Sequence, residues 1–497
     1  MPDVEAHSQS PTATLEPVTR DLPGLETRYF PPTGSTDAAP ISRRSTVEPI
    51  IDGRDYFAKL KAQIDLLGAG DAWYVTGWLF NPDFQFAPGK TLRALLVDRA
   101  NKGVDVRVVI WANRQLIDYP SVPFLGNLRN LVINNVRAAE ALRGEADLAG
   151  RVVIDWSGNA ASSHHMKLNV FSKGGTRTAF VGGIDYDQLR LATPPHDGTK
   201  GRWHDAGVKV TGEAAQRVLD TVVTRWNEAS TLSAATYDIG QGAKAYNPTG
   251  LVPLAPPGAG QALNESADTS IQVVRSFPDS KEFGLISNTP WSTLPRTGVH
   301  ETKMTFQKML NAAQRYIYIE DQAFDAVDSL FPALVEACKR GVKVIAVLPG
   351  MPDPLDGTGP LPRALSSQVR SGIVGKLPPD KQQNLAVYQL KGIIVHSKIV
   401  LIDDELMSIG SANFMDRSME FTFQGDDSEC SVVAASTGNL VRDLRVRLWT
   451  EHLRVPGAGA EADELRDLDL SLGFWRPAWG TGITFDHSNS QLVLVGP

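Results

Sequence analysis

The sequence predicts an α/β protein of two similar lobes, each a mixed β-sheet flanked by helices, with one active site at the pseudo-twofold interface between them. Three observations support this class. Apolar strand patterns alternate with amphipathic helix patterns through most of the 497 residues. The same order of elements occurs twice, about 230 residues apart, which is too long for a solenoid repeat and fits an internal duplication. Each repeat then leads to a strand that carries a histidine and a lysine two residues apart.

The first repeat alternates helix and strand. Residues 56–67 carry apolar side chains three or four positions apart, which predicts an amphipathic helix. Residues 72–80 form an apolar run typical of a strand. A second helix is expected over 92–102, ending at Gly103, and a second strand over 104–111.

The second repeat follows the same order. A helix is expected over 305–313 and a strand over 316–319. Another helix, over 330–340, ends at Gly341, and a strand follows over 342–348. Strands that alternate with helices indicate a largely parallel or mixed sheet covered by helices in each lobe.

Composition marks the borders of the lobes. The N-terminal segment is rich in Pro, Ser, Thr and Asp without periodicity, and the segment between the repeats is rich in Gly, Pro and Ala. We therefore expect a disordered or extended arm (1–45), a first lobe (46–228), an inter-lobe connection (229–270), a second lobe (271–455) and a C-terminal tail packed on the lobes (456–497).

Bulk properties restrict the location and partners. No apolar run approaches the roughly 18 residues of a spanning helix. The polar start of the chain lacks the basic and apolar regions of a secretory signal. We expect a monomer, cytoplasmic on synthesis, without signal peptide or transmembrane segment, so export would need a leaderless, type VI-like route. A net charge of −7 argues against a broad nucleic-acid-binding surface.

The most informative stretch lies in the second repeat. His396 and Lys398 sit inside the β-branched run 393–402, which predicts a buried strand. Residues two apart on a strand share a face, and burying both cations is costly unless an anion meets them. Asp403 follows this strand, and the Gly-Ser-x-Asn string that ends at Asn413 follows the next one.

The first repeat carries a second copy of this pattern. His165 and Lys167 are again two apart on an apolar strand, and a Gly-Gly-x-Asp string ends at Asp185. Ser172 stands where the second copy has Asp403, so the first copy lacks that carboxylate. Two such copies predict one site that contains two imidazoles and two ammonium groups.

These side chains suit the cleavage of a phosphodiester. Lys167 and Lys398 would neutralise the non-bridging oxygens. One imidazole attacks phosphorus and forms a phosphohistidine, while the other protonates the leaving alcohol and later deprotonates the acceptor. Histidine serves both tasks because its ordinary pKa is about 6.5. No step requires a metal or another cofactor.

Each imidazole also needs a carboxylate to fix its tautomer. Asp205 and Glu429 occupy matching places in the two repeats, so we assign each to the histidine of its own lobe, with Glu420 as a second candidate for His396. The remaining assignments are phosphate positioning by Asp185 and Asn413 and support of the motifs by Asp403, Ser411 and Gly183.

The motifs closely resemble the HxKxxxxD…GSxN pattern of the phospholipase D superfamily. The supporting strings include Phe180–Asp185, Trp203–Asp205, Ile317–Gln322 and Asp416–Ser418, and together they are similar to eukaryotic-type enzymes acting on phosphatidylcholine. Compact bacterial lipase effectors share this design. The resemblance implies a nucleophile at His165, a general acid/base at His396, and transfer to water or a primary alcohol.

We therefore expect a phospholipase D that converts glycerophospholipids such as phosphatidylcholine to phosphatidic acid and free headgroup at a membrane surface, by hydrolysis or by transphosphatidylation. The alternatives are a nucleic-acid phosphodiesterase and a phospholipid synthase with the same His/Lys site, or a degenerate interaction protein. The acidic balance argues against nucleic acid, and intact His and Lys in both copies argue against degeneracy.

Overall fold

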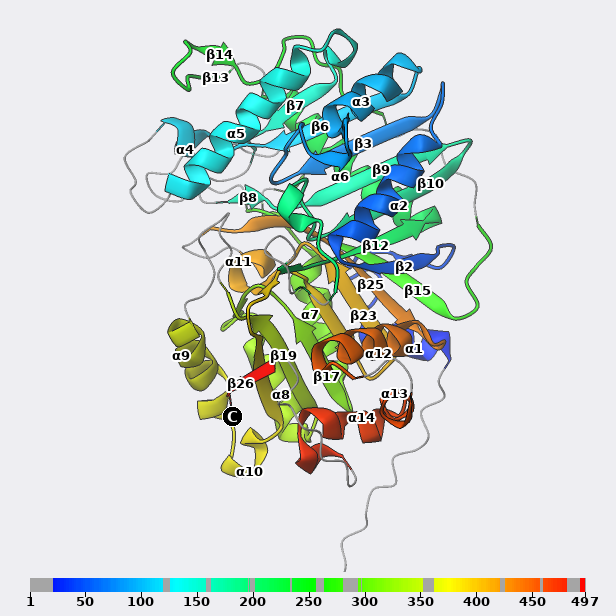
Figure 1. Cartoon of the computed structure of the whole chain (residues 1–497), viewed down its shortest axis with the longest axis vertical. Coiled ribbons are helices and arrows are strands. Elements are labelled where there is room, and N and C mark those ends of the chain that lie inside the picture. Colours follow the sequence, from blue (N-terminus) through cyan, green and yellow to red (C-terminus); the bar gives the residue numbers. More distant parts are fainter. Residues whose placement is uncertain are drawn as a thin grey trace, which may run out of the picture.

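Two β-sheets, one in each lobe, form the framework of the protein, with the first lobe in the upper half of Figure 1 and the second in the lower half. Helices lie between the sheets and on their outer faces. The computed structural model describes residues 21–118, 126–157, 162–194, 196, 202–232, 235–255, 263–279, 294–295, 297–351, 362–420, 425–455, 459–480 and 492–496.

The first sheet has seven strands in the order β2-β12-β10-β9-β3-β6-β7. The four strands on one side pair antiparallel, whereas β3, β6 and β7 pair parallel. The bounds are β2 (Val47–Ile51), β3 (Ala72–Gly77), β6 (Asp105–Trp111), β7 (Val152–Asp155), β9 (Lys167–Lys173), β10 (Thr176–Gly182) and β12 (Ala206–Thr211).

The second sheet repeats this order as β15-β25-β23-β22-β17-β19-β20, with the same strand directions. Two matched sheets are compatible with the expected internal duplication, and the mixed α/β class is confirmed. The bounds are β15 (Thr269–Phe277), β17 (Tyr316–Glu320), β19 (Lys343–Pro349), β20 (Leu385–Leu390), β22 (Ile399–Ile402), β23 (Leu406–Gly410) and β25 (Asp427–Ser436).

Helices divide the apolar interior into three main cores. Side chains of α6 and α12 pack in a central core to which both sheets contribute. Outer cores lie under α2, α3 and α5 in the first lobe and under α1, α7, α8 and α9 in the second. The bounds are α1 (Leu22–Tyr29), α2 (Gly53–Asp65), α3 (Leu92–Asn101), α5 (Gly126–Arg143), α6 (Gly212–Ser230), α7 (Glu301–Ala312), α8 (Phe331–Arg340), α9 (Pro362–Gly372) and α12 (Leu440–Leu453).

The segment expected to be a free arm is partly structured. Its first 20 residues lie outside the described part, but α1 packs into the outer core of the second lobe. Arg28 donates to Asp403 at 2.6 Å and to Glu405 at 2.7 Å. The aperiodic composition therefore did not predict this short helix, because contacts with the second lobe stabilise it rather than a local sequence pattern.

Short elements complete the structure. The inter-lobe connection contains the β13–β14 hairpin, and the C-terminal tail adds α14 and the edge strand β26 to the second lobe. Described bounds are β1 (Ile41–Ser42), β4 (Gln85–Ala87), β5 (Lys90–Thr91), β8 (Ser163–His164), β11 (Trp203–His204), β13 (Thr236–Tyr237), β14 (Lys244–Ala245), β16 (Val299–His300), β18 (Phe324–Asp325), β21 (Ile394–Val395), β24 (Phe414–Met415), β26 (Leu492–Gly496), α4 (Arg114–Asp118), α10 (Pro379–Gln382), α11 (Asp416–Met419), α13 (Ala460–Glu464) and α14 (Leu468–Trp475).

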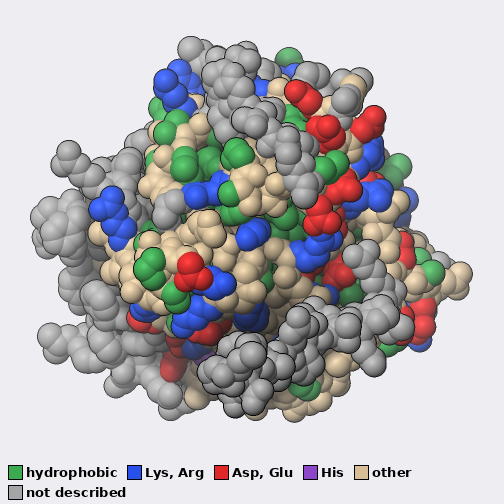
Figure 2. Space-filling model, turned by 90° about the horizontal axis from the view of Figure 1, so that it is seen from below, with side chains coloured by type: hydrophobic (Ala, Val, Ile, Leu, Met, Phe, Trp, Pro, Cys, Tyr) green, Lys and Arg blue, Asp and Glu red, His purple; other side chains and the backbone are tan. Residues whose placement is uncertain are grey.

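The surface seen from below in Figure 2 carries basic and acidic side chains interspersed with separate apolar patches. Across the described residues, no helix has both the length and the apolar character to cross a bilayer.

Candidate active site

Each histidine motif leaves its own sheet and pairs with a strand of the other lobe. β8, which precedes His165, runs parallel to the start of β25, and the His165 N–H donates to Ser428 O at 2.9 Å. In the same way β21, which precedes His396, runs parallel to β11, and the His396 N–H donates to His204 O at 2.7 Å. The continuous strand expected over 393–402 is therefore interrupted at the catalytic residues, because its first part belongs to the inter-lobe pairing.

This exchange decides which carboxylate reaches which imidazole. His396 Nδ1 lies 2.9 Å from Asp205 Oδ2, and His165 Nδ1 lies 3.2 Å from Glu429 Oε1. The pairing expected within each lobe is thus wrong. Each carboxylate immediately follows the residue whose carbonyl accepts the opposite histidine's N–H, and so it reaches across the interface. Glu420 does not contact either imidazole in the described contacts; it forms an ion pair with Lys303.

The two lysines are buried in equivalent positions. Lys167 Nζ donates to His165 O at 2.8 Å, and Lys398 Nζ donates to His396 O at 2.6 Å. Burial lowers the pKa of both lysines, and nearby carboxylates oppose that shift. Lys167 Nζ also lies 3.5 Å from Asp185 Oδ2. The lysines therefore supply fixed positive charge where water is largely excluded.

Asp185 and Asn413 follow equivalent strands but have different surroundings. Asp185 accepts the Leu79 N–H at 3.0 Å and faces Lys167. Asn413 Oδ1 is buried and has no hydrogen-bond partner among the described residues. Because an amide oxygen only accepts, it can meet a ligand hydroxyl, whereas a phosphate oxygen would need the Nδ2 donor of the same side chain; the phosphate-positioning role stays a prediction.

Arg190 is a member of the site that the motifs did not reveal. Its guanidinium is almost completely buried, and Nη2 lies 3.4 Å from His396 Nε2 while Nη1 lies 3.5 Å from Asp205 Oδ2. It also stacks over Trp203, with Cζ 3.6 Å from the ring centroid. The residue lies beyond the motif strings, and a buried arginine has no spacing signal of its own.

The charges around His396 show that the groups share one site. Burial lowers the pKa of His396 well below its ordinary value, and Arg190, Lys398, Lys167 and His165 lower it further. Residues from both motifs therefore act on the same imidazole. Burial also raises the pKa of Asp205 to about 6, against the opposing effect of the Arg190 and Lys398 charges. His396 is consequently neutral near pH 7 in the ligand-free site.

Gly183 and Ser411 occupy equivalent places beside the two carboxylates. The Ser411 hydroxyl donates to Glu429 Oε2 at 2.5 Å. A Cβ added at Gly183 would lie 2.6 Å from Asp205 Oδ1, so only glycine leaves room for this carboxylate. The same Cβ would lie 3.0 Å from His396 O of the second lobe, so the glycine also permits the close approach of the two lobes.

Asp403 lies outside the site and supports the motif from a distance. Its carboxylate accepts the N–H groups of Gln314, Arg315 and Tyr316, at the start of β17, at 2.8–2.9 Å. In the first lobe, the carboxylate that bonds backbone N–H groups between these two strands comes from the start of β3 instead of the end of β9. Asp71, just before β3, accepts the Gly174 N–H in the turn that follows Ser172.

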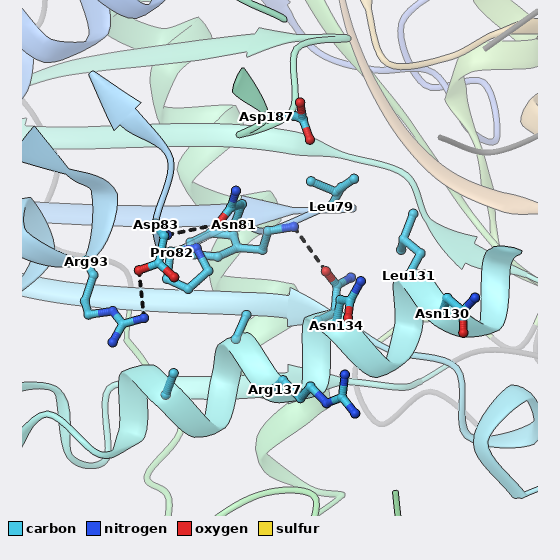
Figure 3. A pocket seen from close by; sticks show the side chains of 14 residues that line it. Leu79, Asn81, Pro82, Asp83, Arg93, Asn130, Leu131, Asn134, Arg137 and Asp187 are labelled. Carbon is cyan, nitrogen blue, oxygen red and sulfur yellow. Dashed lines mark hydrogen bonds and ion pairs between the residues drawn. The ribbon is translucent and has the colours of Figure 1, made fainter. Parts of the chain in front are cut away.

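A pocket of about 600 Å³ lies beside the first motif (Figure 3). Leu79 lines it and donates its N–H to Asp185, so the pocket shares a wall with the site. Arg137 projects from α5 beside it and is exposed (Figure 3). The lining residues are Leu79, Phe80, Asn81, Pro82, Asp83, Arg93, Asn130, Leu131, Asn134, Asn135, Arg137, Ala138, Ala141 and Asp187.

Comparison with known proteins shows which proteins this chain resembles. A family model described as "Cardiolipin synthase, PLD-like domain" matches residues 306–447. Major cardiolipin synthase ClsA of Bacillus subtilis (strain 168) is 26% identical over 395 residues, covering 78% of this chain and 66% of the relative. Cardiolipin synthase 1 of Staphylococcus aureus (strain COL) is 23% identical over 410 residues, covering 82% and 67%. The chain thus spans about two thirds of the length of these curated relatives.

A solved structure extends the likeness of fold to both lobes. Phosphatidylserine synthase of Haemophilus influenzae Rd KW20 superposes with a TM-score of 0.53 at 14% identity, covering 82% of this chain and 85% of that one.

The chain carries a phospholipase D-like domain over residues 306–447, as the motifs predicted, and its fold is similar to that of the phosphatidylserine synthase. The particular relatives found are bacterial cardiolipin synthases. This finding corrects the main functional expectation, because these relatives are phospholipid synthases rather than phosphatidylcholine-hydrolysing or lipid-degrading enzymes.

Proposed function

We propose that the protein is a phospholipid synthase that transfers a phosphatidyl group from one phospholipid to the primary alcohol of another, as a cardiolipin synthase does. The observation that carries the proposal is the pair of cross-lobe imidazole–carboxylate contacts around two buried lysines, in a chain related to cardiolipin synthases. Cardiolipin contains two phosphatidyl groups on one glycerol, so the acceptor is a lipid whose glycerol headgroup has a free primary hydroxyl.

In the first step, His165 Nε2 attacks phosphorus. This nitrogen bonds to none of the described residues, while Nδ1–H is shared between Ser411 O at 3.1 Å and Glu429 Oε1 at 3.2 Å. A P–N bond forms, the P–O bond to the headgroup breaks, and His396 gives its proton to the leaving alkoxide. His396 must first acquire that proton, and the negative phosphate favours this by offsetting the surrounding cations.

In the second step, the acceptor hydroxyl takes the place of the departed headgroup alcohol. His396 accepts its proton, the new P–O bond forms, and the P–N bond to His165 breaks. Lys167 and Lys398 stabilise the charge on the non-bridging oxygens in both steps. Exclusion of water determines whether a second lipid or water resolves the phosphohistidine.

The pocket beside the first motif is suited to a glycerol headgroup. It combines polar Asn side chains with the exposed Arg137, and its wall reaches Asp185 through Leu79. We assign it to the acceptor, whose own phosphate would meet Arg137. The enzyme would act as a peripheral protein on a phospholipid surface, and its expected location is the cytoplasmic face of the membrane.

The test uses vesicles of phosphatidylglycerol with a labelled headgroup, and it follows cardiolipin and free glycerol by mass spectrometry. Wild-type protein should produce both in equal amounts, and His165→Ala should produce neither. His300→Ala, in a histidine that contacts the Thr297 carbonyl, is the matched control. Phosphatidic acid without cardiolipin, choline release from phosphatidylcholine, or cleavage of single-stranded DNA as the main activity would each refute the proposal.

A further inference from the structure

Behind His396 lies a fully buried carboxylate that no motif assigned. Glu320, the last residue of β17, has no exposed surface and accepts four hydrogen bonds. The Ser397 hydroxyl at 2.8 Å and His204 Nε2 at 2.9 Å bond to Oε2, while the Tyr318 hydroxyl at 2.6 Å and His452 Nε2 at 2.8 Å bond to Oε1. We call Glu320 with these four donors the Glu320 hub.

The bonding pattern favours an anion over a metal ligand. Two histidines and a carboxylate also suit a divalent cation. An ionised carboxylate, however, has about four lone-pair sites, and here four donors occupy them. The charges of His204 and His452 overcome the effect of burial and keep the pKa of Glu320 well below its ordinary value. The hub is therefore a saturated anion.

The hub holds both sides of the pairing that presents His396. His204 belongs to β11 of the first lobe, and its carbonyl accepts the N–H groups of His396 at 2.7 Å and Ser397 at 3.1 Å. The next residue is Asp205, which holds the His396 ring. Glu320 thus bonds the side chain on either side of this junction, one from each lobe.

The equivalent place in the first lobe has no such anion. β3 and β17 pair with β9 and β22 in the same register, which aligns Thr76 with Glu320. Met166 stands where the second motif has Ser397. The matched half of the site around His165 therefore has no carboxylate at this strand position, and its buried anion, Asp155, lies elsewhere, where it pairs with His164 and Arg225.

We propose that Glu320 is a positioning residue for the transfer reaction, acting through His204 and Ser397 to set the His396–Asp205 pair in its reactive geometry. This inference rests on the proposed function for its kinetic consequence. Partners behind catalytic histidines typically contribute about 10- to 100-fold. A displacement near 1 Å is sufficient for such a loss.

Three variants test the hub. Glu320→Gln replaces one carboxylate oxygen, which accepts two of the four hydrogen bonds, with an amide nitrogen that only donates. It should lower kcat by about 10- to 100-fold with KM little changed. Ser397→Ala removes one of four bonds and should cause a smaller loss of kcat. Asp404→Asn is the matched control. Asp404 pairs with Arg445, which lies on α12 as His452 does, but Asp404 follows β22 whereas Ser397 precedes it, so this ion pair lies at the far end of the strand from the hub. The control variant should lower the melting temperature while kcat stays within about twofold.

A second readout needs no lipid substrate. Imidazole N–H protons held by carboxylates resonate far downfield in proton NMR spectra. His165→Ala and His396→Ala assign the signals of these two histidines among those of the other carboxylate-bound imidazoles, which include His204 and His452. Glu320→Gln should shift or remove the His396 signal and leave the His165 signal unchanged. A wild-type protein that makes no cardiolipin but shows this selective shift would reject the proposed function and retain the hub.

The proposal is overturned if Glu320→Gln keeps the wild-type kcat and the His396 signal. It is also overturned if Asp404→Asn loses as much kcat as Glu320→Gln, or if the His165 and His396 signals change equally, because the effect would then be general. One equivalent of zinc in purified wild-type protein, absent from Glu320→Gln, would replace the hub with a metal site.

Discussion

The two halves of the active site have the same backbone plan and different chemical surroundings. Each histidine receives its carboxylate from the other lobe. Glu429 is held by two serine hydroxyls, whereas Asp205 meets the Arg190 guanidinium. One imidazole therefore has an open Nε2, while the other is surrounded by cations that keep it neutral. Similar halves can take unlike catalytic roles because their neighbours differ, not their backbones.

The largest effect should come from the imidazoles themselves. His165→Ala should abolish phosphoenzyme formation, and His396→Ala should slow it by at least about 10²-fold because general acid catalysis is lost. Protein denatured during a single turnover at mildly alkaline pH, where the acid-labile P–N bond survives, should carry the phosphatidyl label on residue 165, located by peptide mass spectrometry. Label on residue 396 in the wild type would reverse the roles given to the two halves.

Replacing each carboxylate with its amide tests whether the carboxylates pair with the histidines of the opposite lobes. Asp205→Asn and Glu429→Gln should each reduce kcat by about 10²- to 10⁴-fold, because the wrong tautomer is then favoured. Proton NMR should show that Asp205→Asn removes the downfield signal of His396, and that Glu429→Gln removes that of His165. Loss of the signal from the same lobe would contradict the inter-lobe contacts.

Arg190 sharpens the electrostatic difference between the halves. Arg190→Gln removes the neighbouring charge that lowers the pKa of His396 most strongly, so this pKa should rise toward its ordinary value of about 6.5, while burial continues to hold it down. Because a higher pKa extends protonation to higher pH, His396 should carry its proton over a wider range in the variant. A titration by nitrogen-15 NMR of the ligand-free protein measures the shift. An unchanged His396 pKa would show that the Arg190 charge does not lower it.

The smallest effects concern the supporting carboxylates. Asp403→Asn should destabilise the protein by about 1–3 kcal/mol, because Arg28 then pairs only with Glu405 and the amide accepts fewer of the backbone N–H groups that Asp403 holds. Asp71→Asn should cost about 1 kcal/mol, since Asp71 makes fewer bonds and is partly exposed. Urea unfolding compares the two. Equal losses would mean that the first lobe depends on its carboxylate as strongly as the second.

Much of the fold was predictable because its signals are local. Repeated helix and strand patterns gave the two sheets, and the paired His-x-Lys strings gave the four central groups. The crossed carboxylates were not predictable, because Asp205 and Glu429 reach their histidines through strand pairing between distant segments. Local pattern could not reveal where a strand leaves its own sheet.

Other residues had roles that no pattern revealed. Glu320 lies within the string Ile317–Gln322 and Arg190 lies outside the motif strings, but both take part through burial and hydrogen bonding, which depend on the packed structure and not on spacing. The α1 helix was missed for the same reason, because its main contacts lie in the second lobe. Ser172 looked like a defect in the first motif, yet Asp71 supplies a carboxylate from the neighbouring strand.

Because β8 and β21 each pair with a strand of the other lobe, both halves of the active site depend on the same contact between the lobes. A slight parting of the lobes would strip both imidazoles of their acidic partners at once, while each sheet kept its own fold. Mild denaturant should therefore silence the enzyme before spectroscopic unfolding begins. For the same reason, separately expressed halves should be inert alone and regain turnover when they reassociate.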